Sequence, residues 1–263
     1  MAVKIPAKVK ARLSDGVKKY RGVLRRARDK DVNESDTVTI ITDILDEVLG
    51  YKKITEITSE CAIKKTFCDL AIKIDDKIKL LIEAKAIGLT LKDMHIKQAV
   101  DYGANAGVEW VVLTNGMEWQ IYRIIFSRPL KHELVYSFCF AELNVKSDDD
   151  LELLYLLSKE SISKPSNVSL NDFHTQKQIV NKFTIGQLLV SDVVTDCIRK
   201  NLKKISPVAK ATNDEIKTIL KNEIVKRDVF DDDGAVSAKK RVNKALRSTK
   251  SKGKNESNVE AIK

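Results

Sequence analysis

Two acidic residues and a lysine stand near the ends of two apolar runs of strand length. Asp69 lies in the first run, and Glu83 and Lys85 close the second. Because side chains alternate between the two faces of a strand, Glu83 and Lys85 project from one face and Ala84 from the other. A carboxylate and an ammonium at the end of so apolar a run cost stability, so we expect them to serve a chemical role.

This set of side chains could hydrolyse a phosphodiester with the help of a divalent cation. An acidic turn at Asp75-Asp76 separates the two runs and predicts a β-hairpin. If the hairpin places Asp69 across from Glu83, two carboxylates and one lysine converge. Oxygen ligands of this kind suit Mg²⁺ or Mn²⁺. Lys85 would then orient or deprotonate an attacking water beside a phosphate.

Hydrophobic periodicity predicts the elements that position these residues. A helix is expected over Asn33 to Gly50, followed by three short antiparallel strands. A second helix is expected from Thr90 to Ala106, and it holds Gln98 and Tyr102 on one face because residues four apart are neighbours there. Two further strands flank the turn signal Asn115-Gly116.

Three polar residues of the expected helices have a structural interpretation. Glu34 lies in the first turn of its helix, where a carboxylate favours the helix dipole. Gln98 could belong to a hydrogen-bond network, and Tyr102 could pack in the core. The alternative for Gln98 and Tyr102 is that both face the site formed by the two carboxylates and the lysine.

One ordered set links these elements: Asp69, then Glu83-Ala84-Lys85, then Gln98 and Tyr102. This set resembles the active-site series of the PD-(D/E)xK nuclease superfamily, and more narrowly the N-terminal nuclease domain of type I restriction enzyme R subunits. The resemblance covers the chain from Asn33 to Ile125. It implies an α/β fold of the α+β kind, with a mixed sheet in a restriction-endonuclease-like αβββαβ core. Cys68 stands where the superfamily name has proline.

The resemblance implies a role for each residue of the set. Asp69 and Glu83, with the Ala84 carbonyl, would hold Mg²⁺ or Mn²⁺, and Lys85 would position the attacking water and stabilise charge on the phosphoryl oxygens. Gln98 and Tyr102 of the second helix would steady the phosphate or a nucleotide. Glu34 of the first helix would face the metal.

The activity so implied is that of a Mg²⁺-dependent endodeoxyribonuclease without a motor, in the setting of restriction-modification and phage defence. No Gly-x-x-x-x-Gly-Lys-Ser/Thr loop occurs in the sequence, so an ATP-driven motor is not expected. The alternative is a non-cleaving nucleic-acid-binding or assembly module on the same fold. RNA also stays open as the substrate, because charge directed at phosphate does not distinguish the sugars.

The formal net charge of +10 is concentrated at the two ends of the 263 residues. Residues 1–30 hold eleven Lys or Arg and two Asp, residues 231–263 carry a net charge of +4, and the middle carries −3. This distribution indicates a polyanionic partner, with DNA the first candidate, or else solvated ends that aid solubility.

The periodic segment from Ala7 to Asp29 predicts an amphipathic helix that docks on the domain and presents cations to phosphates. A membrane-surface helix is the alternative.

Cysteine usage and hydropathy indicate the compartment. Four cysteines are scattered without a Cys-x-x-Cys pair, which fits a reducing cytoplasm better than disulfides or a zinc site. The three histidines have no metal-ligand spacing. No apolar run approaches membrane-spanning length, so no membrane partner is expected.

Five segments are expected along the chain: a basic amphipathic helix (1–30), a nuclease-like core (31–160), a linker (161–172), a helical appendage (173–230) and a disordered basic tail (231–263). The appendage could pack on the core, form a dimer contact or hold DNA. A homodimer would be useful for cutting both strands with one site per chain. Partner proteins of a defence system stay open as well.

Overall fold

The chain divides into two compact units, Met1–His174 and Thr175–Lys263. The computed structural model describes residues 4–63, 66–164, 168–208 and 210–257. Residues 165–167 of the expected linker and 258–263 of the expected tail lie outside the described residues. No helix in the described part of the chain is long and apolar enough to cross a membrane.

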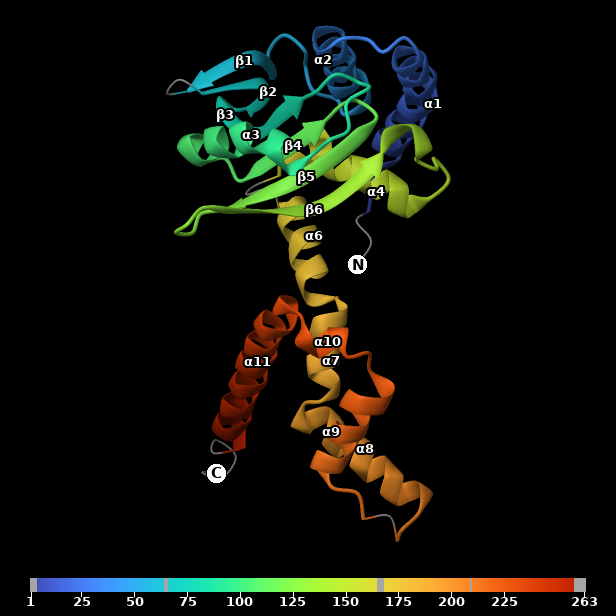
Figure 1. Cartoon of the computed structure of the whole chain (residues 1–263), viewed down its shortest axis with the longest axis vertical. Coiled ribbons are helices and arrows are strands. Elements are labelled where there is room, and N and C mark those ends of the chain that lie inside the picture. Colours follow the sequence, from blue (N-terminus) through green and yellow to red (C-terminus); the bar gives the residue numbers. More distant parts are fainter. Residues whose placement is uncertain (1–3, 64–65, 165–167, 209, 258–263) are drawn as a thin grey trace. The chain divides into compact units, whose positions relative to one another are not determined.

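The first unit has a mixed α/β architecture built on a six-stranded sheet with the order β1-β2-β3-β4-β5-β6 (Figure 1). Neighbouring strands are antiparallel except β3 and β4, which are parallel. A parallel pair needs a crossover, and helix α3 (Asp93–Ala106) provides it. The strands are β1 (Ile57–Ile63), β2 (Thr66–Ile74), β3 (Lys77–Ala84), β4 (Trp110–Thr114), β5 (Glu118–Ile125) and β6 (Lys131–Cys139).

The centre of the sheet is apolar on both faces. All five residues of β4 are buried, as are the last five of β3, because helices cover both sides of these strands. Alternate residues therefore contribute to two core clusters. Ile82 and Val112 belong to the cluster on one face, and Leu81 and Val111 to the cluster on the other.

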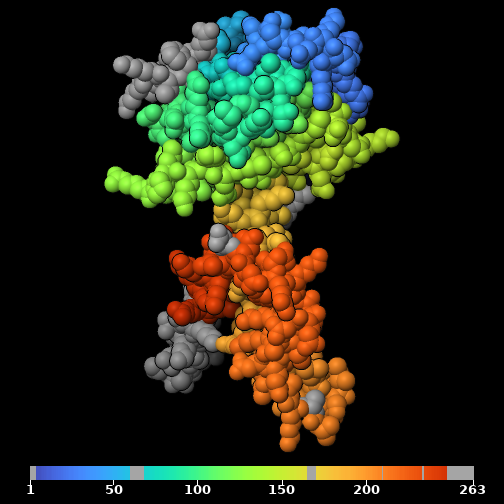
Figure 2. Space-filling view, in the orientation of Figure 1, coloured from blue at the N-terminus to red at the C-terminus, as the bar shows by residue number. Residues whose placement is uncertain are grey.

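Helices α1 (Ala7–Asp29), α2 (Glu34–Asp43) and α4 (Asp148–Leu157) pack on the first face, and a π-helical segment (Ile44–Val48) continues α2. The expected docking of α1 is confirmed, since its apolar stripe is buried: Val9, Leu13, Val17, Tyr20 and Leu24. Helix α3 packs on the opposite face (Figure 1). In the space-filling view of Figure 2, the teal-to-green surface of the segment that contains α3 faces the viewer.

Much of the positive charge of α1 is paired within the first unit. The Arg12 guanidinium donates to both carboxylate oxygens of Glu160, at 2.8 and 2.6 Å. Lys10 pairs with Asp148, and Lys19 with Glu47. These cations hold α1 on the domain, so fewer of them are free for phosphates than the sequence suggests.

The second unit is helical. Helix α6 (Val168–Ile179) spans the boundary between the units. The short α5 (Lys159–Ile162) ends, and α6 begins, within residues 161–172, where a linker is expected. The other helices are α7 (Lys182–Leu189), α8 (Asp192–Ile205), α9 (Asn213–Ile219) with its π-helical continuation (Leu220–Ile224), α10 (Asp228–Asp231) and α11 (Asp233–Ser257).

Helix α11 lies where a disordered tail is expected, and the structure therefore differs from the sequence-based expectation. Ala235, Ala238 and Val242 are buried at spacings of three and four residues. This narrow stripe packs α11 along α7. Small residues give such a stripe little hydrophobicity, which hides it among the surrounding lysines.

Candidate active site

The β2–β3 hairpin sets Asp69 opposite Glu83. The connection is the expected two-residue turn, with Asp75 and Asp76 at φ 49° and 58°, as a type I′ hairpin requires. Beyond the turn, Leu70 pairs with Ile82. Continuing this register by one residue sets Asp69 across from Glu83.

A β-bulge produces this register. Near the turn Ile74 pairs with Lys77, but the register shifts by one residue between Ile72 and Lys73. Without the shift, Asp69 would face Ile82, and Glu83 would project from the opposite side of the sheet. The bulge thus brings the two carboxylates to the same face.

Lys85 lies at the centre of three carboxylates. Its Nζ atom is 2.8 Å from Glu83 Oε1, 3.7 Å from Glu34 Oε1 and 4.0 Å from Asp69 Oδ2. The Ala84 N–H donates to Asp69 Oδ2 at 2.7 Å. Two strands and the first turn of α2 therefore supply one cluster, and all four charged residues that were expected to meet do so.

Burial and mutual repulsion perturb the cluster. Burial and the charge of Glu34 raise the pKa of Asp69, against the Ala84 hydrogen bond and Lys85, which lower it. Burial, with the charges of Asp69 and Glu34, likewise raises the pKa of Glu83. Burial would lower the pKa of Lys85, but the Glu83 hydrogen bond and the three carboxylates raise it overall. Both carboxylates thus resist ionisation, while the lysine stays protonated.

The composition of the cluster fits a divalent cation. With all four groups ionised, three carboxylates and one ammonium carry a formal charge of −2. The Glu83 side chain is only 4% exposed, and its Oε2 atom is buried with no hydrogen-bond partner among the described residues. A buried, unsatisfied carboxylate oxygen is costly unless a cation or a donor reaches it. Among the described residues, no three His, Cys, Asp or Glu side chains are already arranged so that they could hold a metal ion.

Two polar residues to which the sequence assigned no role at the site hold the segment after β3. The Lys85 N–H donates to the Thr114 carbonyl at 2.8 Å, which extends the β3–β4 pairing to the lysine itself. Thr37 Oγ1 accepts from the Ile87 N–H at 3.2 Å, and Asn115 Nδ2 donates to the Leu89 carbonyl at 2.9 Å. Thr37 is fully buried in the structure. The sequence signal that could have identified it is a polar residue in register with the apolar stripe of α2, four residues before Ile41.

Gln98 and Tyr102 have different surroundings, although both lie on α3. Tyr102 is 0% exposed and belongs to the core cluster between α3 and the sheet, whereas Gln98 is exposed. The burial of Tyr102 favours its packing interpretation. A contact between Gln98 and a nucleotide stays a prediction, as does the use of the Ala84 carbonyl as a metal ligand.

Asp69→Asn should raise the melting temperature of the metal-free protein at neutral pH. Because the folded-state pKa of Asp69 is raised, its contribution to stability is present at low pH and is lost as the pH rises through that pKa. Asparagine keeps an acceptor for the Ala84 N–H without the charge. Thermal melts in EDTA near pH 7 and below the ordinary aspartate pKa of about 3.9 should show a gain at the higher pH only.

Asp75→Asn in the exposed turn is the matched control, and it should leave both melting temperatures nearly unchanged. An Asp69→Asn protein no more stable than wild type at neutral pH would show that the cluster is already relaxed without a metal.

Comparison with known proteins gives one match. Residues 40–134 match the family model described as the type I restriction enzyme R protein N terminus (HSDR_N). No curated protein and no solved structure matches the chain. The matched segment runs from within α2 into β6, so it contains Asp69, Glu83 and Lys85 but not Glu34.

Proposed function

We propose that the first unit is a restriction-endonuclease-like domain of the PD-(D/E)xK type that hydrolyses DNA phosphodiester bonds with Mg²⁺ or Mn²⁺. The observation that carries this proposal is the convergence of Glu34, Asp69 and Glu83 on Lys85. The order α2-β1-β2-β3-α3-β4 supports an αβββαβ core. The similarity of residues 40–134 to the restriction enzyme R protein N terminus supports a nuclease-related role in defence against foreign DNA.

Asp69 and Glu83, together with the Ala84 carbonyl, would hold the cation. The unpartnered Oε2 atom of Glu83 and the formal charge of −2 favour a hard divalent ion with oxygen ligands. When bound, such an ion would supply Lewis acidity toward the phosphate and a lowered pKa for a coordinated water.

Lys85 acts as a cation in this proposal. Its raised pKa keeps it protonated at neutral pH, so it suits charge stabilisation on the phosphoryl oxygens and orientation of the attacking water better than removal of a proton. Glu34 is half exposed at 49%, which lets its carboxylate accept a hydrogen bond from that water. Gln98, exposed on α3, would contact the phosphate or a nucleotide.

The second candidate is a non-cleaving nucleic-acid-binding or assembly module. It is favoured by the direct Lys85–Glu83 hydrogen bond of 2.8 Å, which lets the cluster satisfy part of its charge without a metal. Metal binding separates the two candidates, because an ion pair of purely structural purpose has no need of a divalent cation.

Mn²⁺ should stabilise the full chain, and Glu83→Gln should abolish most of that effect. A ligand at a hundred times its Kd stabilises a folded protein by about 2.7 kcal/mol, which raises the melting temperature by several degrees. The neutral amide removes one of two principal oxygen ligands. Thermal melts over a Mn²⁺ titration measure the shift.

Glu118→Gln, an equal change at an exposed position of β5, should keep the wild-type response to Mn²⁺. A wild-type protein that neither binds nor is stabilised by Mn²⁺ or Mg²⁺ would favour the non-cleaving module. An equal Mn²⁺-dependent rise in melting temperature in wild type and Glu83→Gln would show that the cation binds elsewhere.

A further inference from the structure

The second unit carries most of the net positive charge of the protein. By count, Thr175–Lys263 holds 20 Lys or Arg and 11 Asp or Glu, whereas Met1–His174 holds 27 and 26. The net charges are therefore +9 and +1. Since several cations of α1 are paired within the first unit, the electrostatic attraction for a polyanion is concentrated in the helical unit.

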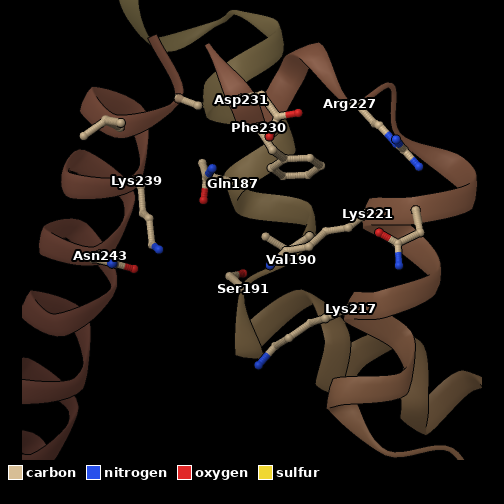
Figure 3. A pocket seen from close by; sticks show the side chains of 13 residues that line it. Gln187, Val190, Ser191, Lys217, Lys221, Arg227, Phe230, Asp231, Lys239 and Asn243 are labelled. Carbon is tan, nitrogen blue, oxygen red and sulfur yellow. The ribbon is translucent and has the colours of Figure 1, made fainter. Parts of the chain in front are cut away.

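Several cationic side chains of this unit line one hollow of its surface. A cavity of ≈ 750 Å³ lies among α7, the α9 continuation, α10 and α11, and Figure 3 shows Lys239 and Asn243 of α11 on one wall with Lys217 and Lys221 on the other. A second hollow of ≈ 370 Å³ shares Asn243 and Lys217 with the first and adds Arg247. The two hollows have four lining residues in common and therefore adjoin, and we call them together the groove. Together they offer room for an extended ligand.

The cations of the groove outnumber its carboxylates. Lys217, Lys221, Arg227 and Lys239 line the larger cavity, with Asp231 as its one acidic residue. Lys217 is paired with Asp192 at 2.7 Å. Among the residues that the structure describes, Lys221, Arg227 and Lys239 have no ion-pair partner. Three ammonium or guanidinium groups are thus available to phosphates.

The remaining lining offers contacts that a nucleic-acid strand uses. Phe230 is partly exposed in the wall of the cavity and could stack on a base. The side-chain amides of Gln187, Asn222 and Asn243 can donate to phosphate or sugar oxygens. Cations, amides and one accessible aromatic ring along a groove are the features of single-strand binding surfaces.

We propose that this groove binds a single-stranded nucleic-acid segment through its phosphates, and so holds the substrate of the nuclease site. The identity of the ligand rests on the proposed function, since it is the DNA that the first unit would cut. The groove itself requires neither a metal ion nor catalysis. Binding can therefore be measured separately from cleavage.

The test uses the full chain with Lys85→Ala, in EDTA, so that the probe stays intact. Fluorescence anisotropy of a labelled single-stranded 20-mer gives Kd as a function of salt. The variant Lys221→Ala/Arg227→Ala/Lys239→Ala should raise Kd at least tenfold at moderate salt. It should also reduce the log–log salt slope by about 2, since each single-strand phosphate contact contributes roughly 0.7.

The matched control is Lys200→Ala/Lys203→Ala/Lys210→Ala, which removes the same charge from exposed positions of the same unit outside the groove. Its Kd should change much less. The proposal is overturned if the groove variant binds the 20-mer with the Kd of its parent. It is also overturned if the control variant loses as much affinity as the groove variant. Either result leaves the nuclease proposal standing if the unsubstituted chain cuts DNA with Mn²⁺.

Phe230→Leu provides a second test, in which the cationic side chains of the groove are unchanged. It should weaken binding of the single strand several-fold more than binding of a duplex, because a stacked base is available only in the former. Equal effects on both probes would contradict the single-strand assignment. Thermal melts of all variants confirm that binding is compared between folded proteins.

Discussion

Lys85→Ala should reduce DNA cleavage by about 10²–10³-fold, the loss typical when a preorganised group that stabilises transition-state charge is removed. The structure places the Lys85 ammonium within 4.0 Å of Glu34, Asp69 and Glu83, where a phosphate held by a cation would lie. Alanine leaves the carboxylates in place and removes the positive charge. The variant should therefore keep or strengthen Mn²⁺ binding while losing activity.

This combination distinguishes a catalytic role from a structural one. Nicking of supercoiled plasmid with Mn²⁺ measures activity, and the Mn²⁺-dependent rise in melting temperature measures binding. Lys77→Ala, at the exposed start of the same strand, should cut like wild type. Equal nicking by wild type and Lys85→Ala would exclude the assigned chemistry, and loss of both activity and metal binding would indicate that Lys85 only organises the cluster.

Ile82→Ala should lower the free energy of unfolding of the first unit by about 2–5 kcal/mol, the range for large-to-small substitutions in a packed core. Ile82 is 0% exposed on β3, between β2 and β4, and it belongs to the cluster that α1 and α2 cover. Helices on both faces limit collapse of the cavity. A loss of this size would unfold a substantial share of a marginally stable domain.

Urea denaturation followed by tryptophan fluorescence measures this loss. Trp110 and Trp119 are the chain's only tryptophans and both lie in the first unit, so the signal reports on that unit alone. Ile54→Ala removes the same atoms at a side chain that is 96% exposed and should change stability by less than about 0.5 kcal/mol. A similar small change for Ile82→Ala would show that the centre of the sheet is loosely packed.

Local patterns were enough to predict the elements around the site. The bounds of α1 agree with its periodic segment, and Asn33, at the start of the expected helix, caps α2 by accepting the Asp36 N–H at 2.9 Å. The Asp75-Asp76 turn joins β2 to β3. These features depend on a few neighbouring residues, because helix periodicity, caps and two-residue turns are short-range properties.

Helix α11 and the charge of α1 show where local patterns were insufficient. The small-residue stripe of α11 becomes recognisable only beside α7. Three cations of α1 are paired by Asp148, Glu160 and Glu47 from later parts of the chain. The basic groove of the second unit likewise combines Lys221 and Lys239 from different helices. None of these neighbours is close in sequence.

The residue types of the candidate site were evident before the fold, since Asp69, Glu83 and Lys85 interrupt apolar strands that have no use for charge. Their convergence depends on a one-residue bulge between Ile72 and Lys73, which no propensity specifies. Strand register is set by the packing of whole faces against helices, and a shift of one residue exchanges the faces. The chain thus encodes the chemistry locally, while the pairing of its strands brings the reacting groups together.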